Sequence, residues 1–298
     1  MSISAQGGRG AVVVTGASSG IGRASAGALA EAGFDVFAGV RKAADGRALE
    51  AELAHAPGRL IPLELDVTDP ELVAKAAATV AGSVGDAGLA GLVNNAGIGT
   101  AWPLELVPRE VLEQQFEVNV FGTVAVTQAL LAQLRAGSGR IVTIGSVGDR
   151  LAIPFGGPLN ATKYATAALN DSLRMELRPW GIEVVLIEPG AIVTPALDKL
   201  QAAAEAAIEG FDQAGREHYA AAFRSMIAHA VAHERKGSPP EVVARTVVRA
   251  MTARRPRTRY LVGATARPLA ALSLLPDRVL DQIRLRIFGL PRAAAPAS

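Results

Sequence analysis

Short apolar runs alternate with alanine-rich stretches of helical spacing along most of this chain. Val and Ile are frequent in the runs and turn residues bound them, which is typical of buried strands. Strands are predicted at 11–15, 35–39, 60–64, 91–94, 139–145, 182–188 and 259–262. Continuously apolar strands joined by helices indicate a parallel sheet that is covered on both faces. Because such crossovers are right-handed, we expect an α/β, doubly wound fold with a seven-stranded parallel sheet.

Two regions interrupt this alternation of strands and helices. Residues 196–237 are long, rich in Ala and Glu, and follow the sixth strand, where a helical substrate lid is expected. Residues 264–290 form a C-terminal extension with an amphipathic helix that we expect to dock on the protein; its apolar positions are Val279, Leu280, Ile283 and Ile287. Without a repeat or linker, we expect a single domain over 1–298, with an unstructured tail at 291–298.

Composition and charge narrow the functional classes. A net charge of +2 is too balanced for a nucleic-acid binder. The chain has no cysteine, which excludes disulfides and thiol catalysis, and its four histidines form no ligand cluster, so no metal site is expected. No apolar run reaches the roughly 20 residues that span a bilayer, and the first residues lack a secretory signal. We therefore expect a cytoplasmic protein without an integral membrane segment.

A glycine-rich turn follows the first predicted strand, in the stretch "VVVTGASSGIG" at 12–22. Glycines at these positions permit a tight turn and a close approach of the backbone to a pyrophosphate. The helix that begins behind them offers free N–H groups and a positive dipole end to that anion. The residues expected at a dinucleotide are Gly16, Ser18, Ser19, Gly20, Ile21 and Gly22.

The end of the second strand bears on which dinucleotide binds. An NAD site usually places a carboxylate there for the ribose 2′-OH, whereas this chain has Val40 followed by Arg41 and Lys42. Two cations without a carboxylate favour a 2′-phosphate, so NADP(H) is the expected cofactor. The alternative is that Arg41 and Lys42 are solvated loop charges.

Seven motifs occur in an order that resembles the short-chain dehydrogenase/reductases. They are "TGASSGIG", "LDVTD", "NNAG", the Asn of "VNVFG", the Ser of "IGSVGDR", a Lys early in a helix, and "PGAIVT". The resemblance implies a Rossmann-type domain, an oxidoreductase activity on a small molecule, and a homo-oligomer in which helices at 118–131 and 163–177 pair. The insertion and the C-terminal extension look like the hydroxysteroid and retinol branch of that family.

The same resemblance assigns cofactor contacts. Asp66 would contact the adenine, with Val67 beside it, and Lys163 would bind the nicotinamide ribose. The adenosine ribose would lie against Asn95, Ala96 and Gly97, and the nicotinamide against Pro189, Gly190, Ile192 and Thr194. Asp66 as a helix cap and the asparagines as turn residues remain alternative interpretations.

The catalytic group that the resemblance implies is incomplete. The family uses a serine, a tyrosine, a lysine and an asparagine, and the chain supplies Ser146, Lys163 and Asn119. The tyrosine belongs four residues before the lysine, where this chain has Leu159. Residues four apart share a helix face, so a tyrosine there would lie beside the ammonium group. Leucine can neither donate nor relay a proton.

Two other tyrosines are weighed as replacements. Tyr164 is five positions from 159, about 140° around a helix, and is expected to face a helix interface instead. Tyr219 is the alternative proton donor, because a residue of the predicted lid can approach a substrate. Loss of a general acid typically costs about 10²- to 10⁴-fold in rate.

Three functional hypotheses therefore remain open. The chain is an NADP(H)-dependent oxidoreductase of apolar carbonyls or alcohols with impaired ketone reduction, or a reductase of iminium or activated C=C substrates, or a non-catalytic NADP-binding protein. The apolar substrate is inferred from residues expected around the cleft: Leu151, Ile153, Phe155 and Leu197. Each of them can alternatively pack its loop onto the core.

Overall fold

The computed structural model describes residues 8–290, apart from three side chains between 196 and 199. The predicted tail at 291–298 lies outside the described residues. Seven strands form one fully parallel sheet in the order β3-β2-β1-β4-β5-β6-β7. The strands are β1 Ala11–Val14, β2 Asp35–Val40, β3 Leu60–Glu64, β4 Leu89–Asn94, β5 Arg140–Ile144, β6 Glu183–Pro189 and β7 Arg259–Val262. The expected α/β fold is confirmed, with strand ends shifted by one or two residues.

The strand order reverses between β1 and β4, because β2 and β3 continue to one side of β1 and the later strands to the other. In open parallel sheets this reversal leaves a crevice at the carboxyl ends of the strands, where ligands bind. The glycine-rich turn follows β1 and therefore opens into that crevice.

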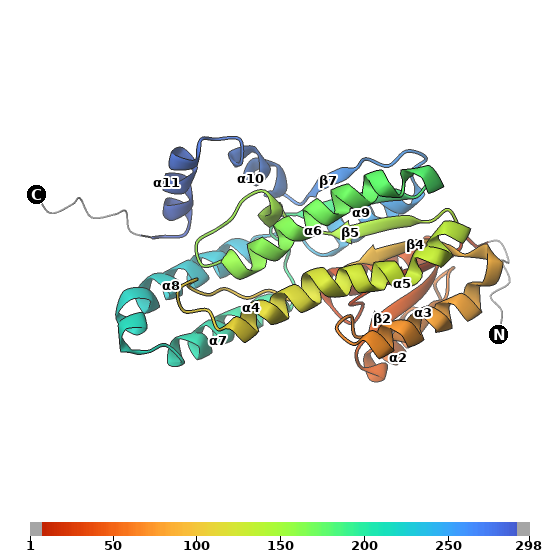
Figure 1. The fold of residues 1–298 in the computed structure, drawn as a ribbon, viewed down its shortest axis with the longest axis horizontal. Coiled ribbons are helices and arrows are strands. Elements are labelled where there is room, and N and C mark those ends of the chain that lie inside the picture. The colour runs from red at the N-terminus through yellow and green to blue at the C-terminus, as the bar shows by residue number, and fades with distance from the viewer. Residues whose placement is uncertain (1–7, 291–298) are drawn as a thin grey trace, which may run out of the picture.

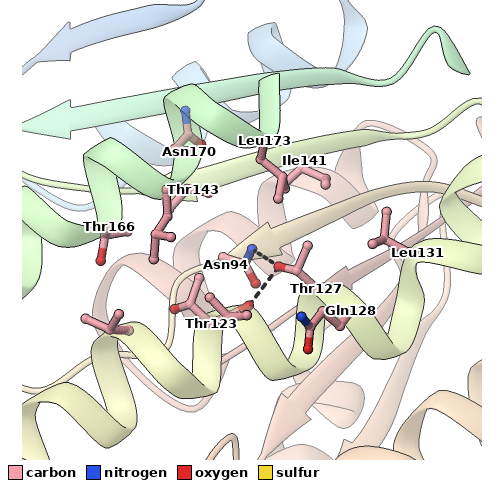
Figure 2. A pocket seen from close by; sticks show the side chains of 13 residues that line it. Asn94, Thr123, Thr127, Gln128, Leu131, Ile141, Thr143, Thr166, Asn170 and Leu173 are labelled. Atoms are coloured by element: carbon pink, nitrogen blue, oxygen red, sulfur yellow. Dashed lines mark hydrogen bonds between the residues drawn. The ribbon is translucent and has the colours of Figure 1, made fainter. Parts of the chain in front are cut away.

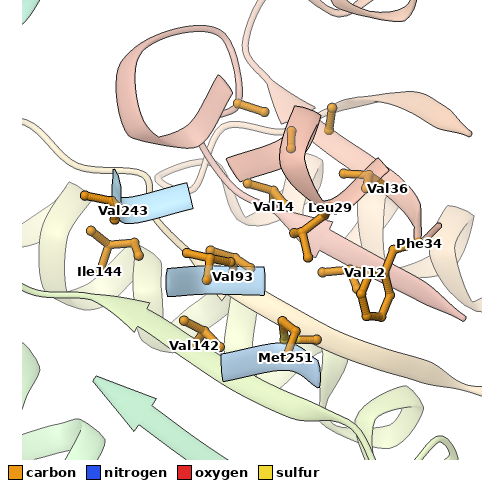
Figure 3. Close-up of a cluster of buried hydrophobic side chains, with 14 of the residues drawn as sticks. Val12, Val14, Leu29, Phe34, Val36, Val93, Val142, Ile144, Val243 and Met251 are labelled. Carbon is orange, nitrogen blue, oxygen red and sulfur yellow. The ribbon is translucent and has the colours of Figure 1, made fainter. Parts of the chain in front are cut away.

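Helices cover both faces of the sheet, and alternate residues of each strand supply the two cores. Val12 and Val14 of β1 pack with helices α1 (Gly20–Glu31) and α9 (Glu241–Thr252) on one face (Figure 3). Val13 packs toward α3 (Pro70–Val84) and α5 (Gly122–Ala136) on the other. Figure 1 shows α5 and α6 running across the near face. The helices of these layers are α1 Gly20–Glu31, α2 Ala43–Glu52, α3 Pro70–Val84, α4 Arg109–Phe116, α5 Gly122–Ala136, α6 Gly157–Glu176 and α9 Glu241–Thr252.

The region predicted as a helical insertion forms two helices, α7 Ala196–Glu209 and α8 Gln213–Glu234. We call this pair the α7–α8 hairpin; it lies at one end of the molecule in Figure 1. Its core is a cluster of aromatic rings in which Phe223 is fully buried and contacts Phe155 and Phe211. Trp102 packs against Phe211 in the same cluster.

The C-terminal extension forms α10 Ala266–Leu272 and α11 Asp277–Ile287. Of the four apolar positions predicted to dock α11, Leu280 is buried, while Val279 and Ile287 are exposed. Ile283 is half-buried, and beyond the helix Phe288 and Leu290 pack against the aromatic cluster of the α7–α8 hairpin. Among the described residues, no helix combines the length and the apolar character that crossing a membrane requires.

Candidate active site

A cleft of about 470 Å³ lies at the carboxyl ends of the strands, around the point where the strand order reverses. It collects residues that are far apart in the sequence and were predicted to hold a dinucleotide. Those that line it are Gly16, Ser18, Ser19, Gly20, Ile21, Gly22, Arg41, Asp66, Val67, Asn95, Ala96, Gly97, Lys163, Pro189, Gly190, Ile192 and Thr194. Of the predicted cofactor residues that the structure describes, Lys42 is the one absent from this lining.

The turn after β1 needs its glycines for geometric reasons. Gly16 has φ +65°, and a Cβ there would lie 2.9 Å from the Cα of Ala96. A Cβ on Gly22 would lie 2.2 Å from the carbonyl oxygen of Gly16, so the first turn of α1 packs directly on the loop. Ser19 occupies the N-cap position of α1 but makes no side-chain cap bond. The first N–H groups of α1 therefore face the cleft without a side-chain acceptor, which suits an anion.

Hydrogen bonds between β1 and the loop after β4 hold this turn in place. The Asn95 amide donates to the carbonyl oxygens of Thr15 (2.9 Å) and Gly16 (3.2 Å). The Thr15 hydroxyl accepts from the backbone N–H groups of Asn95 and Ala96, both at 2.9 Å. Asn95 thus stabilises the glycine turn as well as lining the cleft. Its role is larger than that of a turn residue alone.

The end of β2 presents one of its two cations to the cleft. Arg41 lines the cleft, whereas Lys42 precedes α2 at its N-cap position. Asp66, after β3, accepts from the backbone N–H (3.0 Å) and hydroxyl (2.8 Å) of Thr68 through Oδ1. The cap of α3 is Asp69, which accepts from the N–H groups of Glu71 and Leu72. Asp66 is therefore free of the capping role that was its alternative interpretation.

The predicted catalytic positions converge at the inner end of the cleft. Ser146 lies just after β5, and Leu159 and Lys163 lie on the first turns of α6; all three line the cleft. The Ser146 Oγ accepts a hydrogen bond from the N–H of Gly148 at 3.0 Å. The Leu159 side chain approaches Gly99, where a Cβ would lie 3.4 Å from its Cδ2. A branched apolar group thus occupies the position at which a proton donor was expected.

The Lys163 ammonium lies in a poorly hydrated part of the cleft and donates to the carbonyl oxygen of Ile144 at 3.2 Å. Burial lowers the pKa of Lys163 to about 8, and the nearby Asp149 carboxyl opposes that shift. Desolvation disfavours the charged form of a base, which is the direction observed. The ammonium keeps most of its charge at pH 7 and retains donors for a further acceptor in the cleft.

Asn119 lies one layer behind the cleft, in a π-helical turn at Glu117–Phe121 that joins α4 to α5. Such turns often mark functional positions because they re-aim a side chain. The Asn119 amide donates to the carbonyl oxygen of Ile98 (2.9 Å) and to the hydroxyl of Thr162 (3.0 Å). Its Oδ1 accepts from the N–H of Ile98 at 2.8 Å. The side chain therefore ties the loop after β4 to α6.

None of the three tyrosines, all within the described residues, lines the cleft. Tyr164 is 44% exposed on α6 and does not face the helix interface that its spacing suggested. The Tyr219 hydroxyl is hydrogen-bonded to Glu105, and this bond raises the pKa of the phenol. The Tyr260 hydroxyl accepts from the N–H of Arg257 at 3.0 Å.

The four predicted substrate contacts lie outside the cleft lining that the described residues form. Leu151 is buried, and Ile153 donates its N–H to the Asn160 side chain. Phe155 has φ +59°, a costly conformation for an aromatic residue, and its ring packs against Tyr219 and Phe223. Leu197 is the second residue of α7 and is half-buried. The role of these residues toward a substrate stays a prediction.

Sequence reasoning missed two acidic residues that the fold brings to this region. Glu234, at the end of α8, lines the cleft beside Ile192. Asp149, three residues after Ser146, is buried against Glu188 of β6. Glu234 belongs to no quoted motif, and Asp149 lies within "IGSVGDR", of which only the Ser was assigned a role. Apolar lining that was also missed includes Leu65, Ile98, Val118, Ile144 and Pro195.

A second, smaller hollow of about 80 Å³ lies between α5 and α6 and contains none of the predicted site residues (Figure 2). The Asn94 amide donates to the Thr127 hydroxyl at its floor (2.9 Å). The polar side-chain atoms of Asn170 are buried at its wall without a protein partner. This hollow faces outward from the pair of helices that was predicted to form a subunit interface.

Known proteins share both the sequence and the fold of this chain. A family model described as short chain dehydrogenase matches residues 10–205. An NADPH-dependent 3-dehydrocapnine reductase of Ornithobacterium rhinotracheale is 38% identical, over 91% of this chain and 94% of its own length. Retinol dehydrogenase 5 of Mus musculus is 36% identical, over 96% of this chain and 91% of its own length.

A solved structure extends the match to three dimensions. A short chain dehydrogenase from Burkholderia cenocepacia in complex with NADP superposes with a TM-score of 0.69 at 26% identity. The alignment covers 96% of this chain and 99% of that one. With the family model spanning more than half of the chain and these relatives spanning nearly all of it, the chain belongs to the short-chain dehydrogenase/reductase family of oxidoreductases.

Proposed function

We propose that this chain is an NADP(H)-dependent oxidoreductase of an apolar carbonyl or alcohol, and that Leu159 impairs or alters its reduction of ketones. The observation that carries the proposal is the position of Leu159 in the cleft lining together with Ser146 and Lys163. The other residues expected at the site surround position 159, which itself has no proton donor.

The residues of the cleft fit an NADP(H) cofactor. The exposed N–H groups at the start of α1 would hold the pyrophosphate, and the Arg41 guanidinium would hold the 2′-phosphate. Lys163 would bind the nicotinamide ribose. When bound, the cofactor supplies the hydride. The relative described as an NADPH-dependent reductase supports the same choice.

Reduction of a ketone needs a hydride at the carbon and a proton at the oxygen. Because the Ser146 hydroxyl oxygen accepts from Gly148, its own hydrogen can be donated to a substrate carbonyl. Lys163 contributes positive charge nearby and so favours a developing alkoxide. Leu159 contributes no proton, so the proton would have to come from water, and the barrier would rise by about 3–5 kcal/mol.

An apolar substrate is supported by the wall of the cleft next to Leu159. Ile98 and Val118 line the cleft there, and the α7–α8 hairpin beyond it is built around an aromatic cluster. A largely apolar wall with few polar groups favours a lipophilic ligand. We propose that the hairpin acts as the substrate lid of one domain that spans the chain; limited proteolysis with and without cofactor and substrate would test this.

The experiment that tests the proposed function compares the natural chain with Leu159→Tyr and Leu159→Phe. Each would be given NADPH and a panel of apolar ketones. We expect the tyrosine variant to gain about 10²- to 10⁴-fold in kcat/KM. Phenylalanine has nearly the size of tyrosine but no hydroxyl, so kcat/KM of the Leu159→Phe variant should not rise. Equal rates for the tyrosine and phenylalanine variants, on a ketone that binds, would refute the role assigned to position 159.

A second candidate function is reduction of substrates that need no proton donor at position 159. The absence of a tyrosine from the described lining of the cleft favours it. An iminium arrives already protonated, and an activated C=C bond can take its proton from solvent. If the natural chain turns over cyclic imines or enones faster than Leu159→Tyr, this chemistry is supported. NADPH binding without turnover of any class would instead indicate a non-catalytic NADP-binding protein.

We also propose that two copies pair through α5 and α6. Leu169 lines the hollow between these helices and is 42% exposed, and Phe121, directly before α5, is 55% exposed. Light scattering should give a dimer mass, and Leu169→Arg should lower it to that of a monomer. Leu274→Arg, on a strongly exposed residue after α10, is the matched control and should leave the mass unchanged. Fractionation of cells would test the proposed cytoplasmic location.

A further inference from the structure

Glu234 brings a carboxyl group into the cleft from the α7–α8 hairpin. It is the last residue of α8, and its Oε2 accepts a hydrogen bond from the backbone N–H of Ile192 at 3.1 Å. Both residues line the cleft together with Pro189, Gly190 and Thr194, the residues expected around the nicotinamide. A titratable group of the hairpin therefore holds the loop on which the reactive end of the cofactor would rest.

The chain after Glu234 fixes this contact in place. Ser238 pairs with Ile192 as an isolated parallel bridge, donating its N–H to Ala191 and accepting from the N–H of Val193, both at 3.0 Å. Gly237 packs so closely that a Cβ there would lie 2.5 Å from the carbonyl oxygen of Ala191. The end of α8 is thus clamped to the loop after β6, and the clamp keeps the backbone of Glu234 close to Ile192.

The surroundings of Glu234 offer no counter-charge. Burial raises its pKa to about 7, and the hydrogen bond from Ile192 opposes this only in part. The charged groups that share the described cleft are Arg41, Asp66 and Lys163, and none of them shifts this pKa. The same holds for the neighbouring charged groups along the chain: Glu188, His233, Arg235, Lys236 and Glu241.

A bound dinucleotide would make the charged form of this carboxyl less favourable. It would displace water from the cleft, and its phosphates would add negative charge to a site that holds no cation for Glu234. Both effects favour the neutral acid. A neutral carboxyl keeps one oxygen for the Ile192 N–H and gains a hydrogen that it can donate to an amide oxygen of the ligand.

We propose that binding of NADPH in the cleft is coupled to uptake of a proton by Glu234, which makes this residue a cofactor-positioning group of the α7–α8 hairpin. The inference rests on the proposed cofactor but not on the proposed substrate or on turnover. Its physical consequence is an affinity for NADPH that falls as pH rises, because a proton is bound along with the ligand.

The experiment measures NADPH binding by calorimetry in buffers of different ionisation enthalpy, which reports the protons taken up. The natural chain should take up about 0.5 proton more than Glu234→Gln at pH 7, and nearly one more at pH 8. Its affinity should fall about fivefold between these pH values, relative to the variant. The difference between the two proteins cancels the titration of the 2′-phosphate, which is common to both.

Glu217→Gln is the matched control, since Glu217 lies on the exposed side of the same helix. It should keep the proton uptake of the natural chain. Equal uptake by the natural chain and Glu234→Gln would overturn the proposal, and so would a loss of uptake in the control. If Glu234→Gln fails to fold, an affinity of the natural chain that does not fall between pH 7 and 8 would overturn it as well.

Failure of this inference is separable from failure of the proposed function. Proton-coupled NADPH binding without reduction of any ketone would refute the activity and support the role of Glu234. Ketone reduction without the proton uptake would do the reverse. No binding of NADPH at all would overturn both.

Discussion

Asp149 and Glu188 place two carboxyl groups against each other in the protein interior, directly behind Ser146. Glu188 is fully buried and accepts from Arg150 (2.7 and 3.1 Å) and Arg259 (2.8 Å). Both carboxyl oxygens of Asp149 are buried without a hydrogen-bond partner, and the Nε of Arg150 lies 3.8 Å from its Oδ1. Burial, reinforced by the charge of Glu188, raises the pKa of Asp149 to about 8, so this carboxyl is protonated at neutral pH.

The raised pKa of Asp149 predicts that the free energy of unfolding depends on pH, and that Asp149→Asn weakens this dependence. The folded pKa of about 8 lies above the ordinary value of 3.8, so between these values the folded state binds more protons. The free energy of unfolding therefore falls as pH rises through this window, by up to about 1.4 kcal/mol per pH unit. Asp149→Asn cannot titrate and should show a shallower slope in denaturant melts between pH 5 and 8.

Asp86→Asn is the control for that series, because Asp86 is exposed in a short turn. Its stability should change with pH in parallel with the natural chain. Parallel slopes for the natural chain and Asp149→Asn would show instead that Asp149 is ionised throughout this range.

Arg41 should decide between the two dinucleotides. Removing its charge with Arg41→Ala should weaken NADPH binding about 10- to 100-fold, because a hydrogen bond to a charged group is worth about 1.5–3 kcal/mol. NADH has no 2′-phosphate, so its affinity should change less than about twofold. Fluorescence titration measures both.

Lys42→Ala is the matched control for Arg41, since Lys42 is the neighbouring cation but lies outside the cleft lining. It should change NADPH affinity by less than about threefold. An effect of Lys42→Ala as large as that of Arg41→Ala would mean that general charge, and not one contact, selects the phosphate.

We expect Asn119 to contribute to the stability of the fold, because its side chain joins the loop after β4 to α6. Asn119→Asp keeps an acceptor for the Ile98 N–H but loses the donors to Ile98 and Thr162. An unsatisfied buried group costs about 1–3 kcal/mol, so we expect a loss of at least about 2 kcal/mol in the free energy of unfolding. Denaturant unfolding measures this. Unchanged stability would indicate that the two lost hydrogen bonds are replaced by water.

Phe223 should be the main support of the α7–α8 hairpin. It is fully buried among aromatic rings, and Phe223→Ala should cost about 3–5 kcal/mol. Amide hydrogen exchange should show the increase in opening mainly in α7 and α8. Leu274→Ala, on a residue that is 85% exposed, should stay within about 0.5 kcal/mol of the natural chain. A loss of protection spread evenly over the sheet would contradict a hairpin with its own core.

The sequence was most informative where local geometry alone sets the structure. The glycine turn at 16–22 and the four-residue spacing of Leu159 and Lys163 are local, and the structure brings these residues into one cleft as expected. The strands were recognisable because parallel strands buried on both faces are continuously apolar.

Local patterns failed where side-chain position depends on distant segments. Glu234 reaches the cleft only because Ser238 pairs with Ile192, and Asp149 is buried only because β5 pairs with β6. Leu151 and Phe155 follow Ser146 closely, but Leu151 is buried and Phe155 packs against the aromatic cluster of the α7–α8 hairpin. Their apolar character was consistent with these positions or with a place in the cleft, so the sequence could not decide between them.

The docking of the C-terminal extension connects residues 288–290 with the cleft through helix α8. Phe288 and Leu290 complete the aromatic cluster of the hairpin, and the Ser225 hydroxyl of α8 donates to the carbonyl oxygen of Gly289 at 3.3 Å. The same helix ends at Glu234 beside Ile192. The residues at 288–290 are thus connected to the cleft through α8, and we expect substitutions there to change NADPH affinity without touching the cofactor.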